Sequence, residues 1–362
     1  MKNNKYILKL TVLSLFLMLS AFSLMKDEKT RTINKEFEVN QNTSLSIENK
    51  FGDVNIKNWD KPKVDITVTI KVDHPDAEKA QKLLDYITVD IHKEGDKIVA
   101  VTRIDDKFSK SGSWFNFGNE KKQFSIDYTV NMPSNIDLTL NNRYGDIFIN
   151  ELSGYVNISV KYGNLKANRL TRGEKDPMNQ ISMGYSKGSI GEISWAKMEM
   201  KYSEINIDQS KALIVVSKYS KVFVDKCSSL VSEAKYDTYN IGDISNFVST
   251  AGYTNFRFDK ITKKLNLDVR YSDCRVDYVP AGFESIKVNT SYGGIKIGID
   301  KNASYQLKGD ARYAHINYPE GNKLSVVKEN NSSTVSGLVG SDENTKSSVL
   351  ISTNYGNISL TE

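Results

Sequence analysis

The stretch VVSKYSKVFV at residues 215–224 is built around a lysine–tyrosine pair, and related stretches occur on both sides of it at a fixed interval. Seventeen residues upstream the chain reads MEMKYSEINI, and at the same interval downstream it reads SEAKYDTYNI and then STAGYTNFRF. From Tyr144 to Tyr313 the successive intervals are 18, 23, 17, 17, 17, 17, 18, 21 and 21 residues. Because a repeat of this length predicts stacked units, it decides the fold.

Within each repeat, apolar residues lie at −6, −4, +3 and +5 relative to the aromatic residue, and a small residue lies at +1. Around Tyr219 these are Leu213, Val215, Val222 and Val224, with Ser220 at +1. Alternation with period two predicts a strand on each side of a tight corner at +1 and +2. It also gives Tyr219 the parity of the buried residues, which predicts an inward-facing structural ladder of aromatic rings. The twelve aromatic residues are Phe51, Tyr144, Tyr162, Tyr185, Tyr202, Tyr219, Tyr236, Tyr253, Tyr271, Tyr292, Tyr313 and Tyr355.

One such unit cannot bury its apolar side alone, so successive units must stack with equivalent strands about 4.8 Å apart. The predicted fold is all-β: a single-chain parallel β-solenoid (β-helix) with coils of about 17–21 residues. An antiparallel meander is the alternative, but its two-residue turns would favour Asn-Gly or glycine-rich pairs. The pairs found here, such as Ser-Glu at 203–204 and Ser-Lys at 220–221, suit a solenoid corner better.

The N-terminus has the features of an export signal. Lys2, Lys5 and Lys9 precede an apolar run of about sixteen residues, which is short for a membrane span. Ala21 and Ser23 fit a weak cleavage site, and an uncleaved anchor is the alternative. Removing residues 1–23 removes three lysines and no acids, so the net charge falls from +5 to +2. Compositional support for nucleic-acid binding is then lost.

The expected organisation has three parts: a signal peptide at 1–23, a first coil with an α+β capping section at 24–140, and β-solenoid repeats at 141–362. The capping section contains a predicted helix within 74–87 and a hairpin that turns at KEGD, residues 93–96. Solenoids need caps because a terminal coil has an unpaired edge. The gap between Tyr313 and Tyr355 predicts either a degenerate coil or a protruding hairpin.

The two cysteines occupy inward positions of this register. Cys274 falls at +3 and Cys227 at +8, three coils apart, which is roughly 14 Å by strand spacing. A disulfide needs Cα atoms within about 7 Å. Two free, buried thiols are therefore expected.

The segment LSIENKFGDVNIKNWD, the repeated tyrosine-glycine corners and the final STNYGNISL resemble the bacterial adhesin-like β-solenoid domain family, a domain of unknown function. The resemblance covers roughly 33–362 and rests on a distributed repeat. It implies an exported protein in the periplasm or on the cell surface, with a binding or structural role and no catalytic residues. The chain departs from the family pattern in having tyrosine where asparagine is common.

No pattern indicates a catalytic, cofactor or metal site. His74, His92 and His315 are scattered along the chain. Polysaccharide cleavage is the enzymatic alternative, because it needs two carboxylates about 5–10 Å apart. Glu199 with Glu233, and Asp268 with Asp273 beside Arg270, are the candidate clusters. A solvated face of mixed charge explains these acids more simply.

Two features are candidates for partner binding. The first is a row of cations at −1, expected to be offset by nearby acids such as Glu199, Glu204, Glu233 and Asp273 in a surface ion-pair lattice. The members expected to bind a partner are Lys161, Lys201, Lys218, Lys235 and Arg270. The second is the loop at 108–124, in which Trp114, Phe115 and Phe117 are crowded.

The function expected from the sequence is therefore that of an exported, noncatalytic binding protein that contacts a glycan or a protein partner. A structural or regulatory envelope protein that docks a membrane protein is the second hypothesis, and a polysaccharide-cleaving enzyme is the third. No cofactor and no nucleic-acid partner are expected.

Overall fold

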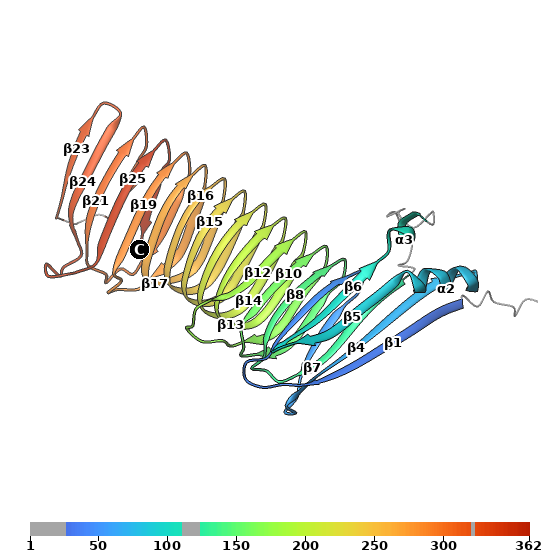
Figure 1. Cartoon of the computed structure of the whole chain (residues 1–362). Coiled ribbons are helices and arrows are strands. Elements are labelled where there is room, and N and C mark those ends of the chain that lie inside the picture. Colours follow the sequence, from blue (N-terminus) through green and yellow to red (C-terminus); the bar gives the residue numbers. More distant parts are fainter. Residues whose placement is uncertain (1–26, 111–123, 320–322) are drawn as a thin grey trace, which may run out of the picture.

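The computed structural model describes residues 27–110, 124–319 and 323–362, which are almost entirely β-strands. Figure 1 shows a long rod of stacked coils with a twisted sheet and two helices at its N-terminal end. Equivalent strands of successive coils pair in parallel, with Lys201 opposite Lys218 and Lys218 opposite Lys235. The predicted parallel β-solenoid is confirmed, and the antiparallel meander is excluded.

Each coil has two faces, which we call the leading face, before the aromatic residue, and the trailing face, after it. Separate strands of the leading face are β2 (Ser44–Lys50), β8 (Asp137–Arg143), β10 (Val156–Lys161), β12 (Asn179–Gly184), β19 (Ser285–Ser291), β21 (Tyr305–Arg312) and β25 (Ser348–Asn354). Separate strands of the trailing face are β3 (Val54–Asn58), β9 (Ile147–Leu152), β11 (Asn164–Leu170), β18 (Asp273–Val279), β20 (Ile295–Ile299), β22 (Ile316–Asn317) and β26 (Ile358–Thr361).

In the middle of the rod, one long strand serves two coils. Each runs along the trailing face of one coil, passes the second corner and continues along the leading face of the next. These strands are β13 (Lys187–Lys201), β14 (Glu204–Lys218), β15 (Lys221–Lys235), β16 (Thr238–Gly252) and β17 (Asn255–Arg270).

The core lies between the two faces and follows the predicted alternation. Leu213, Val215, Val222 and Val224 are each at most 1% exposed, while Ile214, between the first two, is 38% exposed. Cys227 and Cys274 are both buried and free, as expected from their positions in the register. Burial raises the pKa of the Cys227 thiol to about 11 and raises that of Cys274 further. Both thiols are thus core residues without nucleophilic character.

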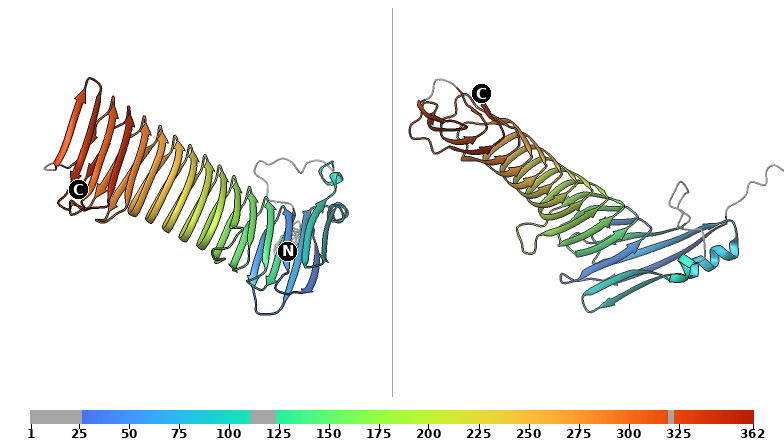
Figure 2. Two further views of the ribbon diagram at one scale, coloured as in Figure 1. Left: turned by 60° about the vertical axis from the view of Figure 1, so that its left-hand side comes forward. Right: turned by 90° about the horizontal axis from the view of Figure 1, so that it is seen from above.

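The N-terminal end is closed by a cap built from β1 (Asp27–Glu38), which precedes the first coil, and from the segment that connects the first coil to the second. Its other elements are β4 (Lys63–His74), α2 (Ala77–Asp85), β5 (Ile87–Glu94), β6 (Lys97–Ile104), α3 (Asp106–Lys110) and β7 (Phe124–Met132). Strands β6 and β7 pair with the first coil, and β5, β4 and β1 extend the sheets outward in antiparallel order. Figure 2 shows this cap widening the end of the rod.

The structure confirms the helix and the hairpin predicted in the cap. The helix predicted within 74–87 is α2, whose first turn is capped by the Asp76 carboxylate accepting from the N–H groups of Glu78 and Lys79. The hairpin between β5 and β6 turns at Gly95, where φ is +57°. The expected boundary after residue 140 falls inside β8, which pairs directly with β2 of the first coil.

The C-terminal end is assembled out of chain order. Strand β25 lies between β19 and β21, and β26 lies between β20 and β22. The segment before them forms a hairpin of β23 (Lys323–Glu329) and β24 (Ser332–Val339), with β24 antiparallel to β21. Of the two expectations for this segment, the hairpin is therefore the correct one.

Among the described residues, neither helix has the length and apolar content needed to cross a membrane. The signal segment predicted at 1–23 lies outside the described residues.

Candidate functional site

The aromatic ladder is the most regular feature of the surface. All twelve aromatic residues have φ between +50° and +63°, the left-handed region. Neighbouring rings stack with centroids 4.8–5.1 Å apart and planes within 20° of parallel. From Tyr162 onward the ladder tyrosines are 39–59% exposed.

The inward orientation predicted for Tyr219 is therefore wrong, although the ladder itself exists. The left-handed residue is itself the corner, one position earlier than expected, and it breaks the alternation. Lys218 at −1 and Tyr219 both face outward, and Ser220 at +1 is the next buried residue, 3% exposed. The rings consequently form a ridge along the edge of the rod.

A row of small buried side chains holds the corners together beneath this ridge. In the central coils, the N–H of Ser203 donates to Ser220 Oγ (3.2 Å), and the N–H of Ser220 donates to Asp237 Oδ1 (2.6 Å). Each serine hydroxyl also donates within its own corner, for example from Ser220 Oγ to the Lys218 carbonyl (3.0 Å). These bonds run along the rod and link one coil to the next.

Asp237 is the one carboxylic acid in this small-residue row. Its Oδ2 accepts from Ser217 Oγ (2.8 Å) and from the N–H of Lys235 (2.9 Å). Ser217 Oγ also lies 2.7 Å from the Tyr239 hydroxyl. Burial raises the pKa of Asp237, although its hydrogen bonds act in the opposite direction. The sequence signal for this site was an acid at +1, where the other coils have Gly, Ser, Thr or Ala.

The basic row at −1 differs from its expected form. Lys161, Lys201, Lys218, Lys235 and Arg270 lie on the leading face beside the ridge, and within the described residues none forms an ion pair with an acid. The predicted ion-pair lattice is therefore wrong for these cations. Glu199 instead pairs with Lys197 (3.1 Å), on its own strand.

Two of these lysines contact the aromatic ridge. The ammonium of Lys218 lies 5.2 Å from the ring centroid of Tyr219, and that of Lys235 lies 5.5 Å from that of Tyr236. Such contacts at exposed sites contribute about 0.5–1 kcal/mol each and leave the charge unneutralised. The leading face thus carries a line of positive charge next to a line of tyrosine rings.

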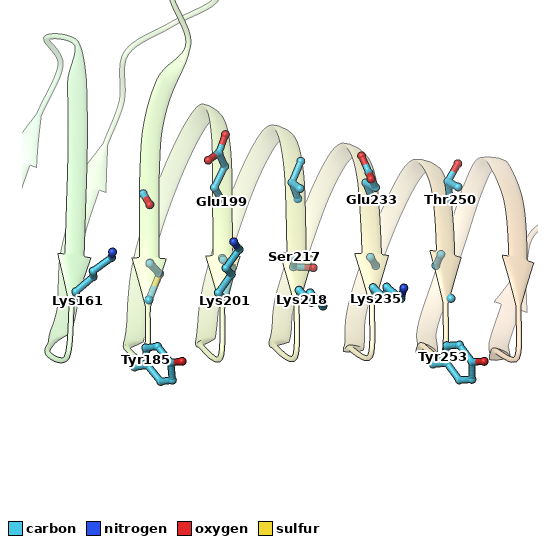
Figure 3. Close-up of a pocket in the computed structure, with 18 of the residues that line it drawn as sticks. Lys161, Tyr185, Glu199, Lys201, Ser217, Lys218, Glu233, Lys235, Thr250 and Tyr253 are labelled. Atoms are coloured by element: carbon cyan, nitrogen blue, oxygen red, sulfur yellow. The ribbon is translucent and has the colours of Figure 1, made fainter.

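These residues line a groove of about 910 Å³ that follows the rod from Arg143 to Tyr271. Figure 3 shows its central part, with the lysines beside the strand ends and the tyrosines at the corner. All five predicted partner-binding cations line it, together with Glu199 and Glu233. The other predicted binding residues, Trp114, Phe115 and Phe117, lie outside the described residues.

The strand register separates the acidic residues of both candidate clusters. Glu199 and Glu233 lie in the same row but two strands apart, with Val216 between them. Asp268 and Asp273 lie on opposite sides of the Tyr271 corner, in β17 and β18. Within the described residues no group of three or more His, Cys, Asp or Glu side chains could hold a metal ion.

An apolar cluster on the leading face was not identified from the sequence. Ile214, Val231 and Val248 are directly opposite one another in β14, β15 and β16, and all are at least 38% exposed. Val216, also 38% exposed, adjoins them and lines the groove. The available signal was an apolar residue at −5, a position that is polar in most other coils.

The fold and groove can be compared with known proteins. A family model described as Toastrack DUF4097 matches residues 42–361. No curated protein matches the chain. A "putative adhesin" from Parabacteroides distasonis is 13% identical, covers 68% of this chain and 93% of its own, and has a TM-score of 0.34.

Two further solved structures are similar over most of the chain. A "putative adhesin" from Bacteroides fragilis is 10% identical, with 91% of this chain and 97% of that chain covered and a TM-score of 0.31. A "putative cell adhesion protein" from Clostridium sporogenes is 11% identical, with 92% and 99% covered and a TM-score of 0.22. At these TM-scores the resemblance carries no functional argument.

Proposed function

We propose a noncatalytic binding role for this chain, which belongs to the Toastrack DUF4097 family. In this proposal it is an exported, adhesin-like protein of the bacterial periplasm or cell surface, and its ligand is an acidic glycan held along the groove. The observation that carries the proposal is the row of cations without ion-pair partners that lines the groove. The export signal read at residues 1–23 supports the location.

The electrostatics favour an extended anionic ligand. Lys201, Lys218 and Lys235 occupy three consecutive coils, so their strands are about 4.8 Å apart. Like charges this close raise the local potential and attract a ligand of opposite charge. A chain lying along the rod can contact all three at once. Many weak contacts then add up without a deep pocket.

The remaining lining suits a sugar chain better than a densely charged polymer. Glu199 and Glu233 lie in the same groove as the lysines and would repel a polymer that offers only anionic groups, such as polyphosphate. Carboxylates and the hydroxyl of Thr250 can accept hydrogen bonds from neutral hydroxyl groups. Glycans with spaced acidic groups offer both kinds of partner.

The test is binding of the chain without residues 1–23 to immobilised acidic polysaccharides such as alginate or polygalacturonate. Reversing the charges of Lys201, Lys218 and Lys235 to glutamate should abolish binding. The matched control reverses Lys211, Lys226 and Lys263, exposed lysines at or near the second corner. Equal losses in both variants, or no binding by the unmodified protein, would exclude the groove as an acidic-glycan site.

A noncatalytic role has its own measurement. Incubation with the same polysaccharides should release neither new reducing ends nor unsaturated products. Appearance of either, together with its loss in Glu199→Gln or Glu233→Gln, would identify the chain as a polysaccharide-cleaving enzyme instead.

An envelope protein partner is the second candidate, and the exposed Ile214, Val231 and Val248 favour it. An apolar cluster beside unpaired charges resembles the composition of a protein interface. In that case Val231→Lys should abolish capture of one specific membrane protein while leaving glycan binding unchanged. The role would then be structural or regulatory.

A further inference from the structure

The cation row at −1 is interrupted by a glycine in two coils of the groove. Gly184 lies between Lys161 and Lys201 in neighbouring strands. Gly252 lies in the same way between Lys235 and Arg270. Glycine inside a strand weakens it and often marks a place where another molecule approaches closely.

The two interruptions differ in whether the space is already filled. A Cβ built on Gly184 would lie 3.3–3.8 Å from the Cγ, Cε and Cδ atoms of Lys161, so the stem of that lysine covers the glycine. A Cβ built on Gly252 would meet only the Arg270 carbonyl oxygen, at 3.9 Å. The space above Gly252 is therefore open, and we call it the Gly252 gap.

The gap is bounded by positive charge on both sides along the rod. Its neighbours Lys235 and Arg270 are two strand spacings apart, about 10 Å. Neither forms an ion pair with a described acid. In Figure 3, Lys235 points along the rod toward the strand that carries Thr250 and Tyr253.

The other sides of the gap complete a small recess in the groove. Ala251 and Ala234, buried small residues, form the neighbouring lining, and the Tyr253 ring stands at the corner. Glu233 and Thr250 lie directly opposite each other in adjacent strands, further from the corner. A negative group in the gap would contact cations on both sides, while the sugar that carries it reaches polar acceptors.

We propose that the Gly252 gap binds one anionic substituent, a carboxylate or a sulfate, of the glycan. This proposal rests on the proposed function and assigns the specificity of the groove to one position. Lys235 and Arg270 bind the anion from opposite sides, as charge-assisted hydrogen-bond donors. The anion fits between them because Gly252 has no side chain to occupy the space. The Gly184 interruption binds no such group, because Lys161 fills that space.

Filling the gap without changing any charge is the sharpest test. Gly252→Val adds a β-branched side chain at a strand position with open space, so thermal stability should be equal or higher. Affinity for an oligogalacturonate should fall about tenfold or more. Gly173→Val is the control, since a Cβ at Gly173 has no atom within 4 Å and this residue does not line the groove, and it should bind within about twofold of the unmodified protein.

A second pair of variants keeps the proposal falsifiable if Gly252→Val does not fold. Arg270→Gln removes one of the two flanking charges and should lower the affinity by a similar factor. Gly252→Lys makes the cation row continuous. It should bind more weakly under the proposal, because its side chain occupies the gap.

The outcomes separate this proposal from the proposed function. If Gly252→Val binds normally, or Gly252→Lys binds more tightly, while the Lys201, Lys218 and Lys235 reversal still abolishes binding, the gap is excluded and the groove remains. If the unmodified protein binds no acidic glycan, both proposals fail. Comparing oligogalacturonate with dextran sulfate distinguishes a carboxylate from a sulfate in the gap.

Discussion

At the scale of single residues, each ladder tyrosine combines an unfavourable backbone conformation with favourable stacking of its ring on neighbouring rings. A non-glycine residue in the left-handed region costs about 1–2 kcal/mol, and asparagine or glycine would adopt it more readily. Stacking contributes about 0.5–1.5 kcal/mol per pair, and most ladder rings have two neighbours. Tyrosine is therefore favoured here by its ring rather than by its backbone.

Substitutions at Tyr219 separate the free-energy cost of its backbone conformation from the contribution of ring stacking. Tyr219→Ala keeps the unfavourable φ of +54° and loses both stacking partners, so the free energy of unfolding should fall by about 1–3 kcal/mol. Tyr219→Asn loses the same contacts but tolerates the backbone better, and it should recover part of that loss. Urea denaturation of both variants checks the order. An asparagine variant less stable than the alanine variant would contradict it.

Asp237 makes stability depend on pH in the direction opposite to most acids. Because burial raises its pKa, its folded state favours the protonated form. Its contribution is fully present below the unfolded pKa, near 3.8, and decreases as pH rises toward the raised folded value. The unfolding free energy of the wild type minus that of Asp237→Asn should therefore fall as the pH rises above about 4. A difference that rises with pH would show that the hydrogen bonds from Ser217, Ser220 and Lys235 stabilise the carboxylate by more than burial destabilises it.

At the scale of elements, the corner between two strands takes one of two forms. The outer coils have glycine at +1, as in Gly145 and Gly163, and a Cβ on Gly163 would lie 1.9 Å from the Gly145 carbonyl oxygen. The central coils have hydroxyl side chains at +1, which bond from coil to coil. The glycine corners are joined by close backbone contact, and the hydroxyl corners are joined by side-chain hydrogen bonds.

The two corner forms should therefore respond differently to alanine. Gly163→Ala places a methyl group inside backbone atoms that cannot move without shifting a strand, and a loss of about 3 kcal/mol or more is expected. Ser220→Ala removes two hydrogen bonds and should cost about 1–3 kcal/mol. Thermal or urea unfolding gives both numbers. The prediction fails if Gly163→Ala is the milder change.

The strands and coils could be predicted from the sequence because their apolar residues alternate and recur at nearly constant intervals. The orientation of Tyr219 could not, since alternation assumes extended backbone and a single left-handed residue reverses it. The outward orientation of Lys218 could be predicted. That it forms no ion pair with Glu199 or Glu233 could not, because this depends on the directions of side chains on neighbouring strands. The difference between Gly184 and Gly252 likewise depends on where the Lys161 stem lies.

At the scale of the whole molecule, the chain is a one-dimensional stack in which each coil contacts its neighbours. The groove therefore extends along the rod, and its affinity is a sum over coils. Raising the ionic strength from about 0.05 M to about 0.5 M shortens the Debye length to less than the spacing of two coils. Binding of an acidic polysaccharide should weaken strongly over this range.

The salt dependence provides a direct control on the cation row. The variant with Lys201, Lys218 and Lys235 reversed should show neither the binding nor its salt dependence, and the second-corner variant should show both. Binding that is independent of salt would indicate that the apolar cluster, with Val231 at its centre, makes the contact instead. Isothermal titration at several salt concentrations makes the measurement.

The position of β25 between β19 and β21 also has a consequence for biogenesis. A chain that emerges N-terminus first can add coils in order, each on an existing template, as far as β20. Strand β21 and the β23–β24 hairpin reach the rod through β25, which is translated after all of them. Strands β21, β24 and β23 can pair with one another before that, but they can join the rod only after the chain has emerged as far as residue 354.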